Sequence, residues 1–164
     1  MKSSLRRSFG LPAVVVLFAV AGCSSSDDAA GITVPTPSGP QAAKCRALHQ
    51  ELPATVDGLK RRATDPVSDF TAAWGEGPSV SLSCGVEKPE KLVRHPDADS
   101  MEIDGVKWMP EKQPDGSVRC TTVTREAWVR VTLPKKVVGD AGDMSALTDL
   151  TDAVRRTIPV GVID

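Results

Sequence analysis

The pattern of apolar residues predicts an amphipathic helix at each end of the folded part of the chain. In residues 41–52 the apolar residues recur at intervals of three and four, as on one helical face, and Pro53 ends the pattern. These apolar residues are Cys45, Leu48 and Leu52. The second helix begins near Asp143, a residue type that caps helices, and ends before Pro159. Its apolar stripe consists of Leu147, Leu150 and Val154.

Between the two helices, apolar residues alternate with polar ones, which is the pattern of strands with one buried face. The predicted strands lie within residues 72–74, 79–85, 101–109, 117–124 and 127–133. Asp104 and Gly105 predict a tight hairpin turn, because this pair adopts the positive φ angles that such a turn needs. Residues 54–69 show neither period and are predicted to form a loop.

This order of elements predicts an α+β fold. We expect a small antiparallel sheet of about four to five strands, with the N-terminal and C-terminal helices packed on it. The chain has 164 residues, which suits a single domain, and we expect that domain to occupy residues 41–164. Hydrophobic residues make up 40% and charged residues 25% of the chain. These ordinary values exclude a collagen-like protein, a long coiled coil and a fully disordered chain.

Residues 1–22 have the features of the signal peptide of an exported lipoprotein. A positively charged start precedes an apolar run over residues 11–21, which is too short to span a membrane. Residues 20–23 read Val, Ala, Gly, Cys and resemble a lipobox, in which small residues precede a cysteine whose thiol takes a diacylglycerol. We therefore predict cleavage after residue 22 and lipidation of Cys23. A pair of arginines near the start leaves the general and the twin-arginine export routes both open.

Residues 23–40 are predicted to form a flexible tether, because their serine, aspartate and proline residues bury too little surface to offset the entropy of ordering. The alternative is that residues 32–34 bind the domain as an N-terminal strand. Loss of residues 1–22 removes three of the 20 Lys and Arg residues and leaves 17 against 21 Asp and Glu, a net charge of −4. An anionic membrane surface does not attract such a chain, so the lipid on Cys23 must provide the attachment.

The remaining cysteines, Cys45, Cys84 and Cys120, allow one disulfide in an exported domain and leave one thiol unpaired. Cys45 lies on the apolar face of the first predicted helix, and Cys84 lies on the apolar face of the strand at residues 79–85. Both side chains therefore point into the interface between helix and sheet, which favours a disulfide between Cys45 and Cys84. A bond between Cys84 and Cys120 is the alternative. Otherwise Cys120 is a buried thiol that acts as a small apolar residue.

A zinc site is the rival interpretation of the same cysteines. Cys45 and His49 are four residues apart on a predicted helix, and Cys84 or Cys120 could complete a tetrahedral set of ligands. However, the sequence has no Cys-x-x-Cys pair and only two histidines, and His49 lies off the apolar stripe. We therefore predict neither a metal site nor a cofactor.

The sequence also lacks the usual signatures of catalysis. It contains no Gly-x-Ser-x-Gly motif, no His-Glu-x-x-His motif and no glycine-rich phosphate loop. The acidic residues between positions 97 and 104 miss the spacing of a calcium-binding loop. We therefore expect a protein without catalytic residues.

Trp128 is the best candidate for an exposed binding contact. It lies on the strand face opposite Val129 and Val131, whereas tryptophans more often sit partly buried with the indole N–H satisfied. The whole chain has a net charge of −1 and no basic stripe, so we do not expect a nucleic-acid partner.

Short blocks of residues spread over residues 45–160 resemble a known family when taken in order. The blocks comprise Cys45, Leu48, Leu52, Pro53 and Gly58, then Ala72, Ala73, Trp74, Gly75, Leu82, Cys84, Gly85, Val86 and Pro89, then Asp104, Gly105, Val106, Trp108, Thr121, Thr122, Arg125, Val129, Val131, Pro134, Ile158 and Pro159. They resemble domain-of-unknown-function family 3515, secreted lipoproteins of high-GC Gram-positive bacteria. The resemblance implies a lipid-anchored exported protein, supports the disulfide between Cys45 and Cys84, and implies no catalytic residue. Cys120 departs from the family pattern, which has an apolar or aromatic residue there.

These observations predict a membrane-anchored exported lipoprotein at the extracellular face of the cytoplasmic membrane. We expect it to act as a non-catalytic binding or interaction module of the cell envelope. Its partners would be the cell membrane, through the lipid anchor, and an unknown envelope protein or cell-wall component. The alternative is a lipoprotein that binds a small solute or a metal ion.

Overall fold

The computed structural model describes residues 30–161. The helices are α1 (Gly39–Glu51), α2 (Glu90–Arg94), α3 (Lys135–Val138) and α4 (Thr148–Thr157), with a 3-10 helix, η1 (Ser145–Leu147), directly before α4. The strands are β1 (Ala30–Gly31), β2 (Thr55–Val56), β3 (Leu59–Arg62), β4 (Thr64–Asp65), β5 (Thr71–Trp74), β6 (Val80–Cys84), β7 (Met101–Ile103), β8 (Val106–Lys112), β9 (Val118–Val123) and β10 (Val129–Leu133). None of the helices in this part of the chain is long and apolar enough to cross a membrane.

The main sheet has eight strands in the order β2-β3-β5-β6-β10-β9-β8-β7, and each strand runs antiparallel to its neighbours. The predicted sheet of four to five strands is therefore wrong, although the fold is broadly α+β. The missed strands β2 and β3 lie within residues 54–69, which were expected to form a loop. They are short, with β2 at the sheet edge and β3 next to it, and each has a single apolar residue, so they show no apolar alternation. Asp57 and Gly58, with φ of 50° and 70°, make the hairpin turn between them.

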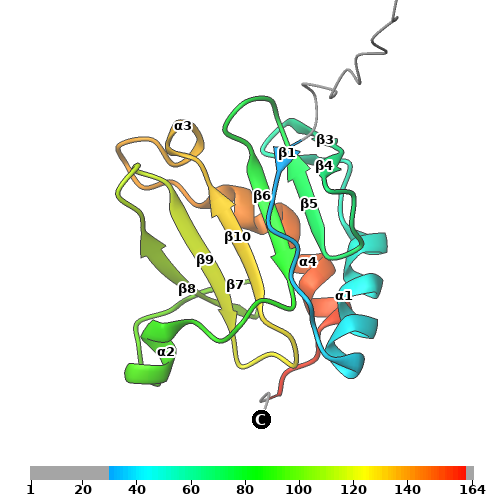
Figure 1. Cartoon of the computed structure of the whole chain (residues 1–164). Coiled ribbons are helices and arrows are strands. Elements are labelled where there is room, and N and C mark those ends of the chain that lie inside the picture. Colours follow the sequence, from blue (N-terminus) through cyan, green and yellow to red (C-terminus); the bar gives the residue numbers. More distant parts are fainter. Residues whose placement is uncertain (1–29, 162–164) are drawn as a thin grey trace, which may run out of the picture.

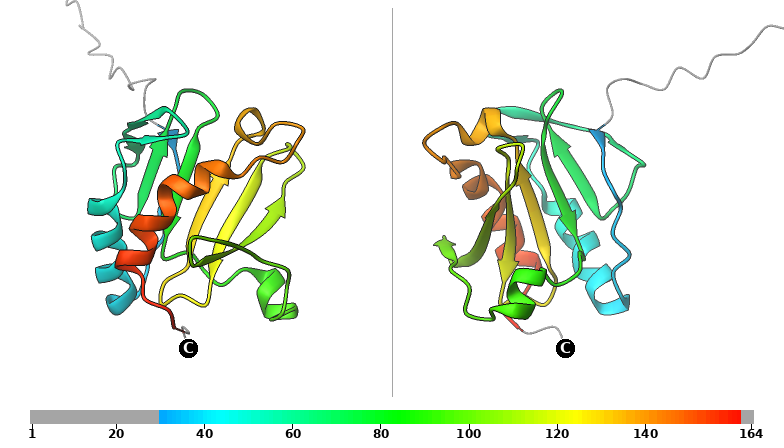
Figure 2. Two further views of the ribbon diagram at one scale, coloured as in Figure 1. Left: turned by 180° about the vertical axis from the view of Figure 1, so that it is seen from behind. Right: turned by 60° about the vertical axis from the view of Figure 1, so that its left-hand side comes forward.

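Helices α1 and α4 lie side by side on one face of the sheet, as the left view of Figure 2 shows. The core lies between these helices and the inward residues of the central strands β6, β10 and β9. The fully buried residues there include Cys45, Leu48, Leu150 and Val154 from the helices and Val80, Val129, Val131 and Leu133 from the strands. The apolar stripes read from the sequence are therefore the surfaces by which the helices contact the sheet.

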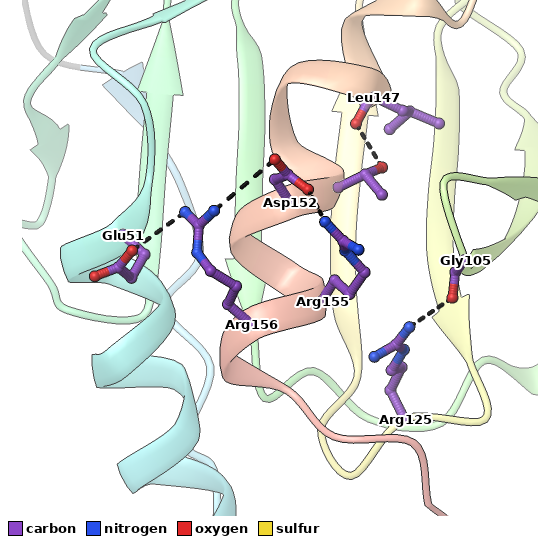
Figure 3. A network of polar contacts seen from close by, with 8 residues as sticks. Glu51, Gly105, Arg125, Leu147, Asp152, Arg155 and Arg156 are labelled. Carbon is purple, nitrogen blue, oxygen red and sulfur yellow. Dashed lines mark hydrogen bonds and ion pairs between the residues drawn. The ribbon is translucent and has the colours of Figure 1, made fainter.

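Polar contacts hold the helical layer in place (Figure 3). Arg156 of α4 forms an ion pair with Glu51 of α1 at 3.2 Å and a second one with Asp152 on its own helix at 3.8 Å. Arg125 is only 4% exposed, and its guanidinium donates to the backbone oxygens of Ile158 at 2.8 Å and Gly105 at 2.7 Å. This buried arginine thus ties the β7–β8 turn to the end of α4.

On the opposite face of the sheet, the described residues form no long helix. The segment that follows β1 crosses this face in front of β6 and leads into α1 (Figure 1). Of the predicted tether at residues 23–40, the structure describes residues 30–40, and these lie against the domain. Strand β1 pairs in parallel with β4, and the Ile32 N–H donates to the Asp65 oxygen at 3.0 Å. Gly85, with φ of 83°, allows Pro37 to approach so closely that a side chain at this position would collide with it.

Candidate binding groove on the open sheet face

The disulfide between Cys45 and Cys84 is confirmed. It joins α1 to the end of β6 across the helix–sheet interface, with 5.5 Å between the two Cα atoms. Both sulfurs are thereby used, so neither cysteine can act as a thiolate ligand for zinc beside His49. Among residues 30–161, no three side chains of the histidine, cysteine or acidic type gather as a metal site would require.

Cys120 is a free thiol in the core, beneath the helical layer. Its Sγ lies 3.8 Å from the Sδ atom of Met144. Burial raises the pKa of the Cys120 thiol to about 12, so the reactive thiolate is scarce at neutral pH. Cys120 therefore behaves as a small apolar side chain.

Trp128 is half-buried on the open face of the sheet, just before β10. Its ring packs against a small cluster formed by Leu92 of α2, Met109 and Val123. Trp74 and Trp108 are fully buried on the helical side. Trp128 therefore helps to seat α2 on the sheet, and its remaining exposed part is available at the surface.

A cavity with a volume of about 810 Å³ lies on the same open face. Its floor is the polar face of β6, β10 and β9, where the register sets Arg130 opposite Ser83 and sets Thr132 opposite both Ser81 and Arg119. One wall is the crossing segment at residues 32–36, and the other consists of α2 and the residues that precede it. We use the name sheet groove for this cavity together with the second cavity, which is described below.

Two arginines dominate the floor of the sheet groove. Arg119 of β9 and Arg130 of β10 are diagonal neighbours on adjacent strands and are both half-buried. The Nε atom of each is buried without a hydrogen-bond partner among the described residues, and neither side chain forms an ion pair there. Burial lowers the pKa of Arg130 from its ordinary value, Arg119 lowers it further, and Glu111 opposes the shift. Arginine stays charged at neutral pH even so.

A second cavity of about 740 Å³ continues the groove toward α3. The two cavities share the lining residues Ile32, Ser81 and Thr132. A third half-buried arginine, Arg62, lines this second part. Its Nη1 donates to the Gly75 oxygen at 3.1 Å, while its Nε is buried and unpartnered in the described part of the chain.

Cations outnumber carboxylates along the whole groove. The lining cations are Lys88, Lys91, Arg94, Arg119 and Arg130 in the first part and Arg62, Lys135 and Lys136 in the second. The lining carboxylates are Glu87, Glu90, Glu111 and Asp115. The groove is thus locally positive in a chain whose net charge is −1. Guanidinium and ammonium groups beside serine and threonine hydroxyls form a donor set that suits oxyanions.

The sequence model for a protein of unknown function, DUF3515, matches residues 8–162. The chain belongs to this family. The family resemblance noted from the short sequence blocks is therefore confirmed. No curated protein and no solved structure matches the chain.

Sequence reasoning on this DUF3515 protein missed the arginines of the sheet groove. The available signal was an arginine between two buried apolar residues in a strand, as at Arg119 between Val118 and Cys120. Such a position places the charge on the outer face of a central strand, which is separated from the sheet edge by other strands. The sequence does not show that the register then sets Arg119 beside Arg130.

Proposed function

We propose that this DUF3515 protein is an exported, membrane-anchored lipoprotein that acts as a non-catalytic binding module. The sheet groove would be its binding site, and the ligand would be an anion of the cell envelope. The anchoring part of the proposal is supported by the lipobox-like residues that end at Cys23, which lies outside the described residues. The binding part is supported by the groove.

The observation that carries the binding proposal is the uncompensated pair Arg119 and Arg130. Two like charges that share a half-buried site repel each other, and each loses part of its hydration. Glu111 lies opposite Arg119 in the register, but no carboxylate of the described chain reaches either guanidinium within ion-pair distance. An oxyanion bound between them would supply the missing charge and accept from the unpartnered Nε groups.

The proposal is tested by calorimetric titration of the full-length chain, purified in detergent, with pyrophosphate. Arg119→Gln and Arg130→Gln should each weaken binding by about tenfold or more, since each removes a charge-assisted hydrogen bond. Arg155→Gln is the matched control, because Arg155 is exposed on α4 at the opposite side of the sheet. Binding that is absent, or that all three variants retain unchanged, would refute the groove as an anion site.

A further inference from the structure

The sheet groove is longer than a single small anion needs. Its two cavities adjoin at Ile32, Ser81 and Thr132. Figure 1 places α2 and α3, which flank them, at opposite ends of β9 and β10. Strand β10 has five residues, and at about 3.3 Å per residue it separates the two ends by roughly 16 Å. A ligand that fills the groove must therefore be extended.

The cations are spread along this length in three groups. Lys88 and Lys91 lie at the α2 end, Arg119 and Arg130 lie in the middle, and Lys136 marks the α3 end. Cations outnumber carboxylates at each end, and one small anion at Arg119 and Arg130 would leave this excess positive charge at both ends unbalanced. Only a ligand with several negative charges in a row engages all three groups.

The lining residues also indicate which chemistry the ligand has. Among residues 30–161 no aromatic side chain lines either cavity, so these residues offer no surface there on which a sugar ring or a nucleobase stacks. Recognition therefore depends on charge. A planar carboxylate presents one edge to one guanidinium fork, whereas a phosphate group spreads its charge over several oxygens that point in different directions. Phosphate thus better suits the two adjacent guanidinium groups of Arg119 and Arg130 with ammonium groups nearby.

We infer that the sheet groove binds a linear polymer whose backbone or side groups carry phosphate, lying along the open face of the sheet from α2 to α3. This inference rests on the proposed function and specifies the ligand of the same site. The crossing segment at residues 32–36 forms a wall of the first cavity, and its first residue, Ile32, lines both cavities, so the segment would contact the bound polymer from the junction toward the α2 end.

The test compares pyrophosphate with linear polyphosphates of increasing length on the full-length chain in detergent. After correction for overlapping positions on the polymer, affinity should rise by about tenfold or more from pyrophosphate to the long chains and then level off once the groove is filled. The slope of log affinity against log salt should be steeper for the long chain, because more charges are neutralised.

Variants separate the ends of the groove from its middle. Arg62→Gln and Lys136→Gln should weaken long-chain polyphosphate by severalfold and leave pyrophosphate unchanged, whereas Arg119→Gln should weaken both. Arg155→Gln should change neither. The melting temperature of each variant, measured without ligand, shows whether it is folded.

Three outcomes would overturn the inference. Equal corrected affinities for pyrophosphate and long polyphosphate would make the groove a site for one small anion, and the proposed function would survive. Polyglutamate that binds as tightly as polyphosphate of equal charge would refute the assignment of phosphate. If neither phosphate probe binds at Arg119 and Arg130, the proposed function is refuted as well.

Discussion

The buried Arg125 of this DUF3515 protein and the half-buried Arg119 and Arg130 differ in how their charge is satisfied. Arg125 donates to the oxygens of Gly105 and Ile158, so its charge is satisfied by carbonyl dipoles and holds two segments together. Arg119 and Arg130 have no such acceptors in the described structure. A buried charge whose role is structural has an acceptor within the protein, because a buried charge without an acceptor lowers the free energy of unfolding. The unpaired arginines are therefore the ones that we assign to a ligand.

His49 is a second residue whose surroundings have a measurable consequence. Its Nε2 lies 3.0 Å from Nη2 of Arg61, and a ring nitrogen that faces a guanidinium must be an acceptor and therefore unprotonated. Burial, and then the charge of Arg61, lower the pKa of His49 below the ordinary histidine value. The unfolded chain therefore takes up the proton more readily than the folded one does. Unprotonated His49 therefore contributes to the free energy of unfolding above about pH 6.5, and this contribution is lost as the pH falls below that value.

We predict that the free energy of unfolding falls more steeply between about pH 7 and pH 5 in the wild type than in His49→Gln. Glutamine does not titrate, and its amide oxygen can still accept from Arg61. Urea unfolding at a series of pH values measures the difference. His95→Gln serves as the control, because His95 is exposed and should keep the wild-type slope. Parallel curves for wild type and His49→Gln would contradict the prediction.

At the scale of elements, the segments with strong periodicity were predictable and the polar ones were not. The stripe that includes Leu48 in α1 and the one that includes Leu150 in α4 are buried, as their spacing indicates. Strands β2 and β3 were missed because they are short and contain one apolar residue each, which leaves no alternation to detect. Asp57 and Gly58 offered the same turn signal as Asp104 and Gly105, but the flanking residues lacked the apolar alternation that accompanied the second pair.

The site was less predictable than the fold, because the pairing of strands creates it. Arg119 and Arg130 are 11 positions apart in the sequence, and no motif marks either of them. They become neighbours only when β9 pairs with β10 in the observed register. The cations at the two ends come from α2 and α3, which the sequence pattern did not indicate. A chain without a basic stripe can therefore still carry a basic groove.

The disulfide links two elements whose other contacts are made through side-chain packing. We predict that Cys45→Ala and Cys84→Ala each lower the free energy of unfolding by about 2–5 kcal/mol, since the bond closes a loop of 39 residues. The double variant should lose little more than either single one, because both remove the same bond. Cys120→Ala should lose only about 1 kcal/mol, the contribution of one small buried group. Urea unfolding measures these values, and additive losses for the double variant would contradict the shared-bond explanation.

At the scale of the whole molecule, the position of the groove relative to the proposed anchor is informative. Cys23 precedes the first residue of β1 by seven positions, and at about 3.6 Å per residue this stretch reaches at most roughly 25 Å. The chain enters the groove at the end of β1, at Gly31 and Ile32. A lipid on Cys23 would therefore hold the groove close to the membrane surface.

The anchor itself supplies the last prediction. Cys23→Ser should abolish incorporation of a radioactive fatty acid in growing cells, because the thiol that forms the thioether is gone. If the chain is cleaved after residue 22 as proposed, the variant should then lose its hold on the membrane, since the remaining net charge of −4 gives no attraction to an anionic surface. Cys120→Ser is the matched control, because it removes a thiol from the core and should remain labelled. Equal label on wild type and Cys23→Ser would show that the chain is not lipidated at this cysteine, and the proximity of the groove to the membrane would then need another cause.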